Sequence, residues 1–559
     1  MKPICLMILL CGFALAQSKT DDTLSGKVLL EDGQPAAGAT LELRPVGTRG
    51  GRDEQSIQCD ETGSFKLRGI APGSYSIFAL TPGYVSTDDD RVYRPGETAT
   101  IRLVKGGVIT GRISDSFGEP LVNAEIKVQR LRDLNGKPVR NGDDSWWNGD
   151  TRTDDRGIYR AYGLPPGVYI VSSNSDNGER WMGNSDNELP TYYPATTRDA
   201  AMEITIRPGD EVSNIDIRHR AETGHAISGT ISGAAEPTQP YNSPGITLLH
   251  AATKEVFSST STNQAKVFVF FGIPDGEYEI YARQHGRKED NAAGSAPQRV
   301  TVRGADVTGI TLRMVAYGSI SGRVVPEPAK AADAKCDPKA SLSVEEILLN
   351  AKSELRNPRS LNALLGDADE SNDRVAPNEK GEFTLRQLEP DGYRIEADLP
   401  GENWFVRSMT LPPVGAAKTK TDAARSAINL KPGEKLANLE ITLAEGAASL
   451  SGRVAAKEGV NLPSRLRVHL IPAEATATDE VLRYRETVIE KNGSFEFKHL
   501  APGKYRLLAR SIPDTEKDKP RPAAFDPTER LKLKKESEAA TTEIELKPCQ
   551  RAKDHVLRF

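Results

Sequence analysis

One segment of about twenty residues recurs five times along this chain. Each copy combines a tight-turn signature with two short runs in which apolar residues alternate, separated by a second turn. The copies begin roughly 85 to 130 residues apart, which is a domain length and not a solenoid period. They read DETGSFKLRGIAPGSYSIFAL from Asp60, DDRGIYRAYGLPPGVYIVSS from Asp154, NQAKVFVFFGIPDGEYEIYA from Asn263, NEKGEFTLRQLEPDGYRIEA from Asn378 and EKNGSFEFKHLAPGKYRLLA from Glu490.

Two further segments recur in step with the first. A five-residue motif opens each unit: LSGKV, ITGRI, ISGTI, ISGRV and LSGRV, starting at Leu24, Ile109, Ile227, Ile320 and Leu450. A glycine turn followed by alternating apolar residues closes most units, as in PGETATIRL and PGEKLANLEI. Alternation with period two predicts strands with one buried face, so every unit is expected to be rich in short strands.

The first unit shows the expected local structure. Strands are predicted over 25–30, 40–43 and 98–103, with a hairpin whose Pro72-Gly73 turn joins two more. About seven short strands per unit are typical of a two-sheet sandwich. An aromatic residue after the second turn is predicted to bury its ring and direct its hydroxyl to a backbone group near the rim. The tyrosines concerned are Tyr75, Tyr169, Tyr278 and Tyr505.

These motifs resemble carboxypeptidase regulatory-like domains, which are transthyretin-like sandwiches. The resemblance is carried by GQPAAGATLEL from Gly33, by the Asp-x-x-Gly-x-Phe turn and by the Leu-x-Pro-Gly-x-Tyr strand. It implies an all-β chain, a tandem array of about five seven-strand Greek-key β-sandwich domains arranged in a row. It also implies binding, spacer or accessory modules and no reaction. Unit 3 departs from the pattern, because Ala265-Lys266 stand where the turn glycine is expected.

The repeats set the expected domain limits. The fourth unit also carries an insertion, in which Ser343 to Glu346 fit a capping box and Val344, Ile347, Leu348, Ala351 and Leu355 share one helical face. A short helix is therefore predicted there, packed over its own sandwich or docking a partner. The predicted limits are 1–16 for a signal peptide, 22–106 for unit 1, 107–223 for unit 2, 224–316 for unit 3, 317–446 for unit 4 and 447–559 for unit 5.

The first residues predict export. MKPICLMILLCGFALAQ has a positive start, an apolar stretch too short to span a bilayer and a small-x-small cleavage site before Gln17. No membrane span is expected after its removal, and the periplasm, the cell surface and the medium remain open as destinations. Cys59, Cys336 and Cys549 would remain. Because three is odd, at least one stays unpaired or pairs between chains, and a Cys336–Cys549 bond is one alternative.

Composition and motifs disfavour several classes of function. The net charge is −5 and no long basic run occurs, so nucleic acid is not expected as a partner, and Lys532, Lys534 and Lys535 are interpreted as a solvated strand. His219 and Glu222 have the HxxE spacing of zinc carboxypeptidases, with His225 nearby, but they lie in a linker. The oxygen-rich loops at 88–90 and 141–144 lack calcium-loop spacing. Neither metal, cofactor nor catalytic residues are predicted, and a metallocarboxypeptidase-type enzyme is the distant alternative.

One aromatic cluster suggests a ligand surface in unit 2. Aromatic rings stack on the apolar faces of sugars, and the neighbouring Asp and Asn side chains can bind hydroxyls. The competing interpretation is that these rings cover the end of the sandwich. We therefore expect an exported, non-catalytic binding or spacer protein of the cell envelope or surface, with protein partners, and carbohydrate binding to an extracellular or periplasmic polysaccharide as the alternative. The candidate ligand-binding residues are Trp146, Trp147, Trp181, Tyr192 and Tyr193.

Overall fold

The computed structural model describes most of the chain from residue 22 onward. Within that range the described residues exclude 48–54, 87–90, 137–138, 140–151, 175–187, 234–242, 254–255, 285–291, 330–335, 337–341, 354–373, 414–419, 457–461, 464, 475–479, 490–492, 513–521 and 540–542. The predicted signal peptide therefore lies outside the described residues.

Unit 1 folds as two four-stranded sheets packed face to face. In the first sheet, β1 (Thr23–Leu30) lies between β4 (Ser64–Arg68), which is antiparallel to it, and β8 (Thr98–Lys105), which is parallel. Phe65 and Leu67 are buried and Lys66 between them is exposed, so the alternation points into the core as predicted. The other strands are β2 (Thr40–Val46), β3 (Gln55–Gln58), β5 (Ser74–Leu80), β6 (Tyr84–Ser86) and β7 (Val92–Tyr93).

The same pairing recurs in the other units, and the predicted all-β sandwich fold is confirmed. The opening strand always pairs antiparallel with the hairpin strand and parallel with the closing strand. Opening, hairpin and closing strands are β9 (Gly107–Ser114), β11 (Ile158–Leu164) and β15 (Glu211–Val212) with β16 (Ile217–Arg218); β17 (His225–Ser232), β20 (Val267–Ile273) and β24 (Val307–Ala316); β25 (Gly318–Glu327), β28 (Glu382–Leu388) and β33 (Lys435–Glu445); β34 (Ala448–Ala455), β37 (Ser494–Leu500) and β40 (Arg551–Arg558).

The remaining strands build the second sheets and the sheet edges. They surround five separate hydrophobic cores, one inside each predicted unit. These strands are β10 (Glu125–Arg132), β12 (Gly167–Asn174), β13 (Thr191–Tyr192) and β14 (Ile204–Ile206); β18 (Gly245–His250), β19 (Val256–Ser261), β21 (Gly276–Gln284), β22 (Ala293–Ser295) and β23 (Gln298–Val302); β26 (Leu348–Ser353), β27 (Arg374–Val375), β29 (Gly392–Asp398), β30 (Trp404–Leu411), β31 (Thr421–Asp422) and β32 (Ile428–Asn429); β35 (Leu466–Pro472), β36 (Arg485–Val488), β38 (Gly503–Ser511) and β39 (Glu543–Leu546).

The glycine of the opening motif is required by the parallel pairing. In every unit, a Cβ added at this glycine would lie 2.0 to 2.2 Å from a backbone carbonyl oxygen of the closing strand, which no real Cβ tolerates. The invariant choice of glycine within this chain is thus a consequence of the close approach of two backbones. The glycines are Gly26, Gly111, Gly229, Gly322 and Gly452.

The predicted tyrosine hydrogen bond is present in each unit. Tyr75, for example, is 9% exposed, and its hydroxyl donates to the carbonyl oxygen of Ala71 at 2.8 Å. Tyr393 makes the same bond in unit 4, to the residue four positions earlier. In unit 3 the hairpin forms without the turn glycine, because Lys266 adopts the left-handed conformation (φ 61°). The other tyrosine donors are Tyr169, Tyr278 and Tyr505.

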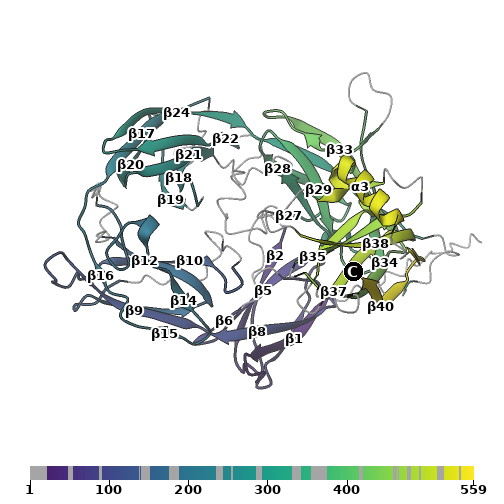
Figure 1. The fold of residues 1–559 in the computed structure, drawn as a ribbon, viewed down its shortest axis with the longest axis horizontal. Helices are drawn as coiled ribbons and strands as arrows, with labels where there is room; N and C mark the ends of the chain where they lie inside the picture. Colours follow the sequence, from purple (N-terminus) through teal and green to yellow (C-terminus); the bar gives the residue numbers. More distant parts are fainter. Residues whose placement is uncertain are drawn as a thin grey trace, which may run out of the picture.

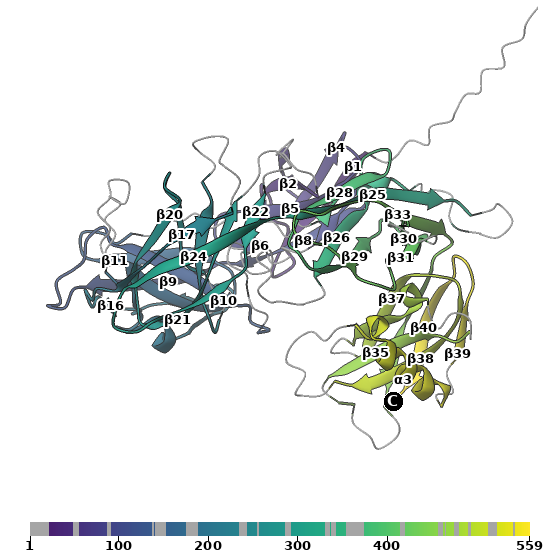
Figure 2. The ribbon, with the colours of Figure 1, turned by 90° about the horizontal axis from the view of Figure 1, so that it is seen from above.

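The units do not lie in a row. Figure 1 shows units 1 to 4 following one another around a ring, so that β2 and β5 of unit 1 come close to β27 of unit 4. The backbone N–H of Ala376 in unit 4 donates to the carbonyl oxygen of Gly47 in unit 1 at 3.2 Å. Figure 2 shows that unit 5 projects from the layer that the other four units form. The predicted linear arrangement is therefore wrong, since contacts between sequence-distant units close the chain on itself.

The predicted helix in unit 4 is also wrong. Only Val344–Glu346 forms a short 3₁₀ turn (η3), and Leu348–Ser353 is strand β26, which pairs with β29. Leu348 and Leu349 are both fully buried, although neighbours in a strand face opposite sides. Leu349 belongs to the core of unit 4, whereas Leu348 packs beside Gly47 of unit 1. Burial against a second unit thus produced an apolar spacing that resembles a helix.

A helix occurs instead in unit 5. Helix α3 (Pro527–Glu538) includes Lys532, Lys534 and Lys535, so their interpretation as a solvated strand is wrong. Asp526 caps the helix, because its side chain accepts from the backbone N–H groups of Thr528 and Glu529. The Asp-Pro start was a readable helix signal that the polar composition obscured.

A disulfide joins units 4 and 5. Cys336 and Cys549 are bonded, with a Cα–Cα distance of 5.2 Å and 213 residues between them in the sequence. This distance is within the usual range for disulfides. Cys59 is a free, buried thiol in the core of unit 1. The structure therefore selects the pairing that the sequence left open.

Candidate functional site

The predicted ligand-binding residues are only partly described. Trp146, Trp147 and Trp181 lie outside the described residues. Tyr192 and Tyr193 follow one another at β13, where their roles separate. Tyr193 packs against the core of unit 2. Tyr192 lines a small pocket at the joint between units 2 and 3, so only this tyrosine is placed for contact with a ligand.

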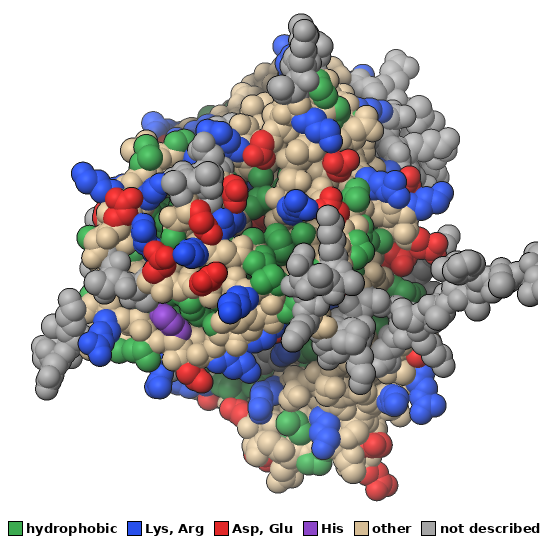
Figure 3. All heavy atoms as spheres, turned by 90° about the vertical axis from the view of Figure 1, so that its right-hand side faces the viewer, with side chains coloured by type: hydrophobic (Ala, Val, Ile, Leu, Met, Phe, Trp, Pro, Cys, Tyr) green, Lys and Arg blue, Asp and Glu red, His purple; other side chains and the backbone are tan. Residues whose placement is uncertain are grey.

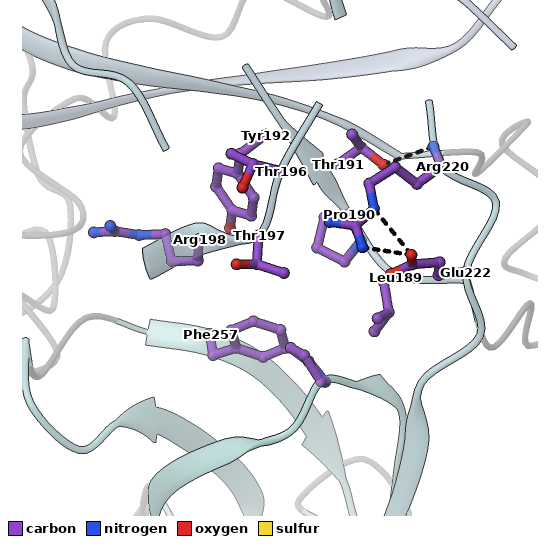
Figure 4. A pocket seen from close by; sticks show the side chains of 11 residues that line it. Leu189, Pro190, Thr191, Tyr192, Thr196, Thr197, Arg198, Arg220, Glu222 and Phe257 are labelled. Atoms are coloured by element: carbon purple, nitrogen blue, oxygen red, sulfur yellow. Dashed lines mark hydrogen bonds and ion pairs between the residues drawn. The ribbon is translucent and has the colours of Figure 1, made fainter. Parts of the chain in front are cut away.

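The pocket is built from both units. Tyr192 and Thr197 come from unit 2, and Phe257 on β19 and Pro274 come from unit 3. Figure 4 shows the Phe257 ring across from Thr197 and Pro190, with the Arg198 guanidinium pointing away from them. The pocket encloses about 20 Å³, which is room for about one water molecule. In this arrangement it holds no sugar ring.

The polar wall of the pocket is already internally paired. The Arg220 side chain contacts Glu222 through Nε at 3.0 Å, and the Arg220 backbone N–H donates to Thr191 Oγ1 at 3.1 Å (Figure 4). The Leu189 N–H donates to the carbonyl oxygen of Glu222 at 2.7 Å. These bonds tie the strand that leaves unit 2 to the segment around β13, and they fix the joint.

A serine, a histidine and a carboxylate meet beside this joint. His219 Nδ1 lies 3.2 Å from Ser173 Oγ, and His219 Nε2 lies 3.3 Å from Glu188 Oε2. A nucleophile needs an open face toward a substrate, but Ser173 is 0% exposed and His219 is 4% exposed. The arrangement satisfies buried polar groups and supports the segment that carries Thr191 and Tyr192.

The HxxE residues point to different partners. His219 contacts Ser173 and Glu188, Glu222 contacts Arg220, and His225 lies 3.3 Å from Asp275. Among the described residues no group of three or more His, Cys, Asp or Glu side chains is arranged to hold a metal ion. The loops at 88–90 and 141–144 that were considered for calcium lie outside the described residues.

A second junction, which the sequence did not reveal, joins three units. Arg94 of unit 1 is 9% exposed. Its Nε donates to the backbone carbonyl of Glu346 at 3.1 Å, and its guanidinium lies 3.2 Å from Asp398, both in unit 4. Ser74 Oγ of unit 1 also donates to the Glu346 carbonyl, at 2.9 Å. His499 of unit 5 lies beside this group, with Nδ1 2.9 Å from the carbonyl oxygen of Trp404.

The joint between units 4 and 5 has its own clamp. Arg551 of unit 5 donates to the Asn403 Oδ1 at 2.7 Å and pairs with Glu402 at 3.0 Å, both in unit 4. The Arg394 guanidinium of unit 4 lies 4.1 Å from the centre of the Phe525 ring of unit 5. Together with the disulfide, these contacts hold the projecting unit in one orientation.

The surface carries mixed charges. Figure 3, which faces the right-hand side of Figure 1, shows basic and acidic side chains interspersed. A phosphate backbone binds to a surface of one sign, which this face does not provide. None of the helices in the described residues combines the length and apolar character that crossing a membrane requires.

Comparison with known proteins identifies one domain. The family model described as carboxypeptidase regulatory-like domain matches residues 23–104, which is unit 1. No curated protein matches the chain. The resemblance seen in the sequence is thus supported for unit 1 by a family match, and for the other units by the shared strand pairing alone.

Solved structures that are similar come from bacterial surface proteins. The Bacillus anthracis TIE protein is 16% identical over 52% of this chain and 50% of that chain, with a TM-score of 0.14. The Bacillus cereus major pilin subunit BcpA is 12% identical over 52% and 98% (TM-score 0.14). Two B repeat units of the Staphylococcus aureus collagen binding protein are 12% identical over 76% and 99% (TM-score 0.13). Scores this low carry no argument about arrangement or function.

Proposed function

We propose that this chain is an exported, non-catalytic binding or spacer protein of the cell envelope or surface, whose sandwich units are held in one fixed arrangement. The observation that carries the proposal is the clamping of units that are distant in sequence. Arg94 ties unit 1 to unit 4, and the Cys336–Cys549 bond ties unit 5 to unit 4. A disulfide between structural units is typical of an oxidising compartment, which supports export.

The absence of an open reactive site among the described residues supports a non-catalytic role. The one serine–histidine–carboxylate group in the described part is buried, and the polar groups of the pocket are paired with one another. What the geometry offers is a body of fixed shape with variable loops, which suits the presentation of binding surfaces to protein partners.

Cell fractionation tests this proposal. In an export-competent host, the full chain is expected outside the cytoplasm, beginning at Gln17 and carrying the Cys336–Cys549 bond. A matched chain lacking residues 1–16 should stay inside with both thiols reduced. Retention of the full chain in the cytoplasm would count against export and against the spacer role at the envelope.

Polysaccharide binding at the joint of units 2 and 3 is the second candidate. The observation that favours it is the pocket in which Tyr192 and Phe257 are brought together from two units. Aromatic side chains flanked by hydroxyl and charged groups suit sugar recognition. Because the enclosed space is too small for a sugar ring, binding there requires the two units to move apart.

Immobilised polysaccharides test this candidate. Saturable binding is expected to weaken at least tenfold in Tyr192→Ala/Phe257→Ala and in Trp146→Ala/Trp147→Ala. Tyr162, which is 65% exposed on β11, supplies a matched control as Tyr162→Ala. Equal binding by all variants, or none by the native chain, would remove polysaccharide from the account and leave protein partners.

A further inference from the structure

The contact between units 1 and 4 has a feature that simple packing does not need. It buries a carboxylate-bearing residue, Glu346, at the point where the ring closes. The backbone carbonyl of Glu346 accepts from both Ser74 and Arg94. In the described residues, the Glu346 carboxylate itself has no hydrogen-bond partner. Arg94, the nearest cation, is already engaged by that carbonyl and by Asp398.

The charges around Glu346 do not favour its ionised form. From unit 1, Arg94 attracts a negative charge there and Glu97 repels it, and the adjacent Glu345 repels it as well. Asp398 of unit 4 lies on the far side of Arg94 and shares its positive charge. From unit 5, His499 and Arg485 face the same group of charges. An ionised Glu346 is therefore desolvated without being well compensated.

We propose that this contact is a proton-sensitive latch: the ring is closed while Glu346 is protonated and loosens when Glu346 ionises. Loosening separates unit 1 from unit 4 and exposes Leu348, which the closed ring covers beside Gly47. This inference goes beyond the proposed spacer role, because it makes the shape of the body depend on its surroundings.

The direction of the pH dependence follows from the pKa of Glu346. Burial raises that pKa from 4.5 to about 7, with Arg94 opposing and Glu97 and Glu345 adding to the rise. In the open ring Glu346 regains an ordinary value. The open form therefore ionises first, and the latch loses stability as the pH rises from about 4.5 to about 7. Because Glu346 is only half-buried, we expect the closure constant to fall by about tenfold in total.

Distance measurements between spin labels test the latch. Glu31→Cys in unit 1 and Lys380→Cys in unit 4 place labels on exposed turns, and Cys59→Ala removes the free thiol. One narrow distance distribution is expected at about pH 5, and a second, broader population at about pH 8. Glu346→Gln keeps the narrow distribution at both values. Glu440→Gln, on an exposed ion pair with Lys420, is the matched control and behaves as the parent.

Arg94→Ala shows what an open ring looks like and is expected to broaden the distribution at both pH values. If Arg94→Ala broadens it and the parent protein is unchanged between the two pH values, the ring has a latch that protons do not control, and the proposal is overturned. If Glu346→Gln keeps the pH response of the parent, Glu346 is not the responsible group. If Arg94→Ala leaves the distribution narrow, the contact does not hold the ring.

Discussion

Arg94 and Glu346 stand 252 residues apart in the chain, yet the Arg94 side chain donates a hydrogen bond to the Glu346 backbone carbonyl. The same guanidinium also pairs with Asp398. A buried arginine with two partners on another unit fixes an angle as well as a contact, because its donors have a rigid planar geometry. This pair therefore converts a string of five sandwiches into a ring of four with a fifth unit attached.

The glycine of the opening motif should resist substitution. Gly229→Ala places a Cβ 2.2 Å from the carbonyl oxygen of Ile310, and the resulting overpacking should lower the free energy of unfolding of unit 3 by about 3 kcal/mol. Gly245→Ala in the same unit is the matched control, since its nearest atom is 3.8 Å away. Thermal unfolding of both variants checks this. Equal stability of the two would contradict the close approach of β17 and β24.

Unit 5 should lose stability in acid because of one histidine. Burial lowers the pKa of His469 to about 3, and Arg510 and Arg467 act in the same direction. The unfolded chain gains a proton near pH 6.5 whereas the folded unit does not, so stability is present above about 6.5 and declines as the pH falls toward 3. His469→Gln should flatten the decline, as followed by denaturant titration at several pH values. His555→Gln, at a less buried histidine on β40, is the comparison.

That account fails if His469→Gln and the native chain lose stability with the same slope between pH 6 and pH 4. The expected slope for the native chain is up to about 1.4 kcal/mol per pH unit from this residue.

Thiol reactivity should follow the disulfide and the burial. Burial raises the pKa of the Cys59 thiol, with Asp60 adding to the effect. The mature chain should therefore show no fast-reacting thiol when native and should release only Cys59 on denaturation without reductant. Mass spectrometry should recover one linked peptide pair that contains Cys336 and Cys549. Recovery of Cys59 in a disulfide would contradict the pairing.

The repeat was enough to predict the sandwich fold, and the failures have one physical cause. Tyr75 and its equivalents were readable because ring burial and the hydroxyl bond are both local, within five residues. The ring of units was not readable, because the residues that close it, Arg94 and Glu346, look like ordinary surface charges in their own segments. Leu348 misled in the same way, since its burial comes from another unit.

The candidate site was predicted only in part. An aromatic-rich segment pointed to unit 2, and Tyr192 does line the pocket there. Phe257, which forms the opposite wall, lies in the alternating pattern of β19 and carries no distinguishing signal in sequence. Sites that form between units require knowledge of how the units meet, which the repeat pattern does not contain.

Small-angle X-ray scattering of the mature chain at about pH 5 tests the central claim most directly. The account predicts a compact particle whose scattering matches the closed ring with unit 5 projecting from it, and a larger radius of gyration for Arg94→Ala. Scattering typical of an extended row of five domains, unchanged by Arg94→Ala, would contradict it.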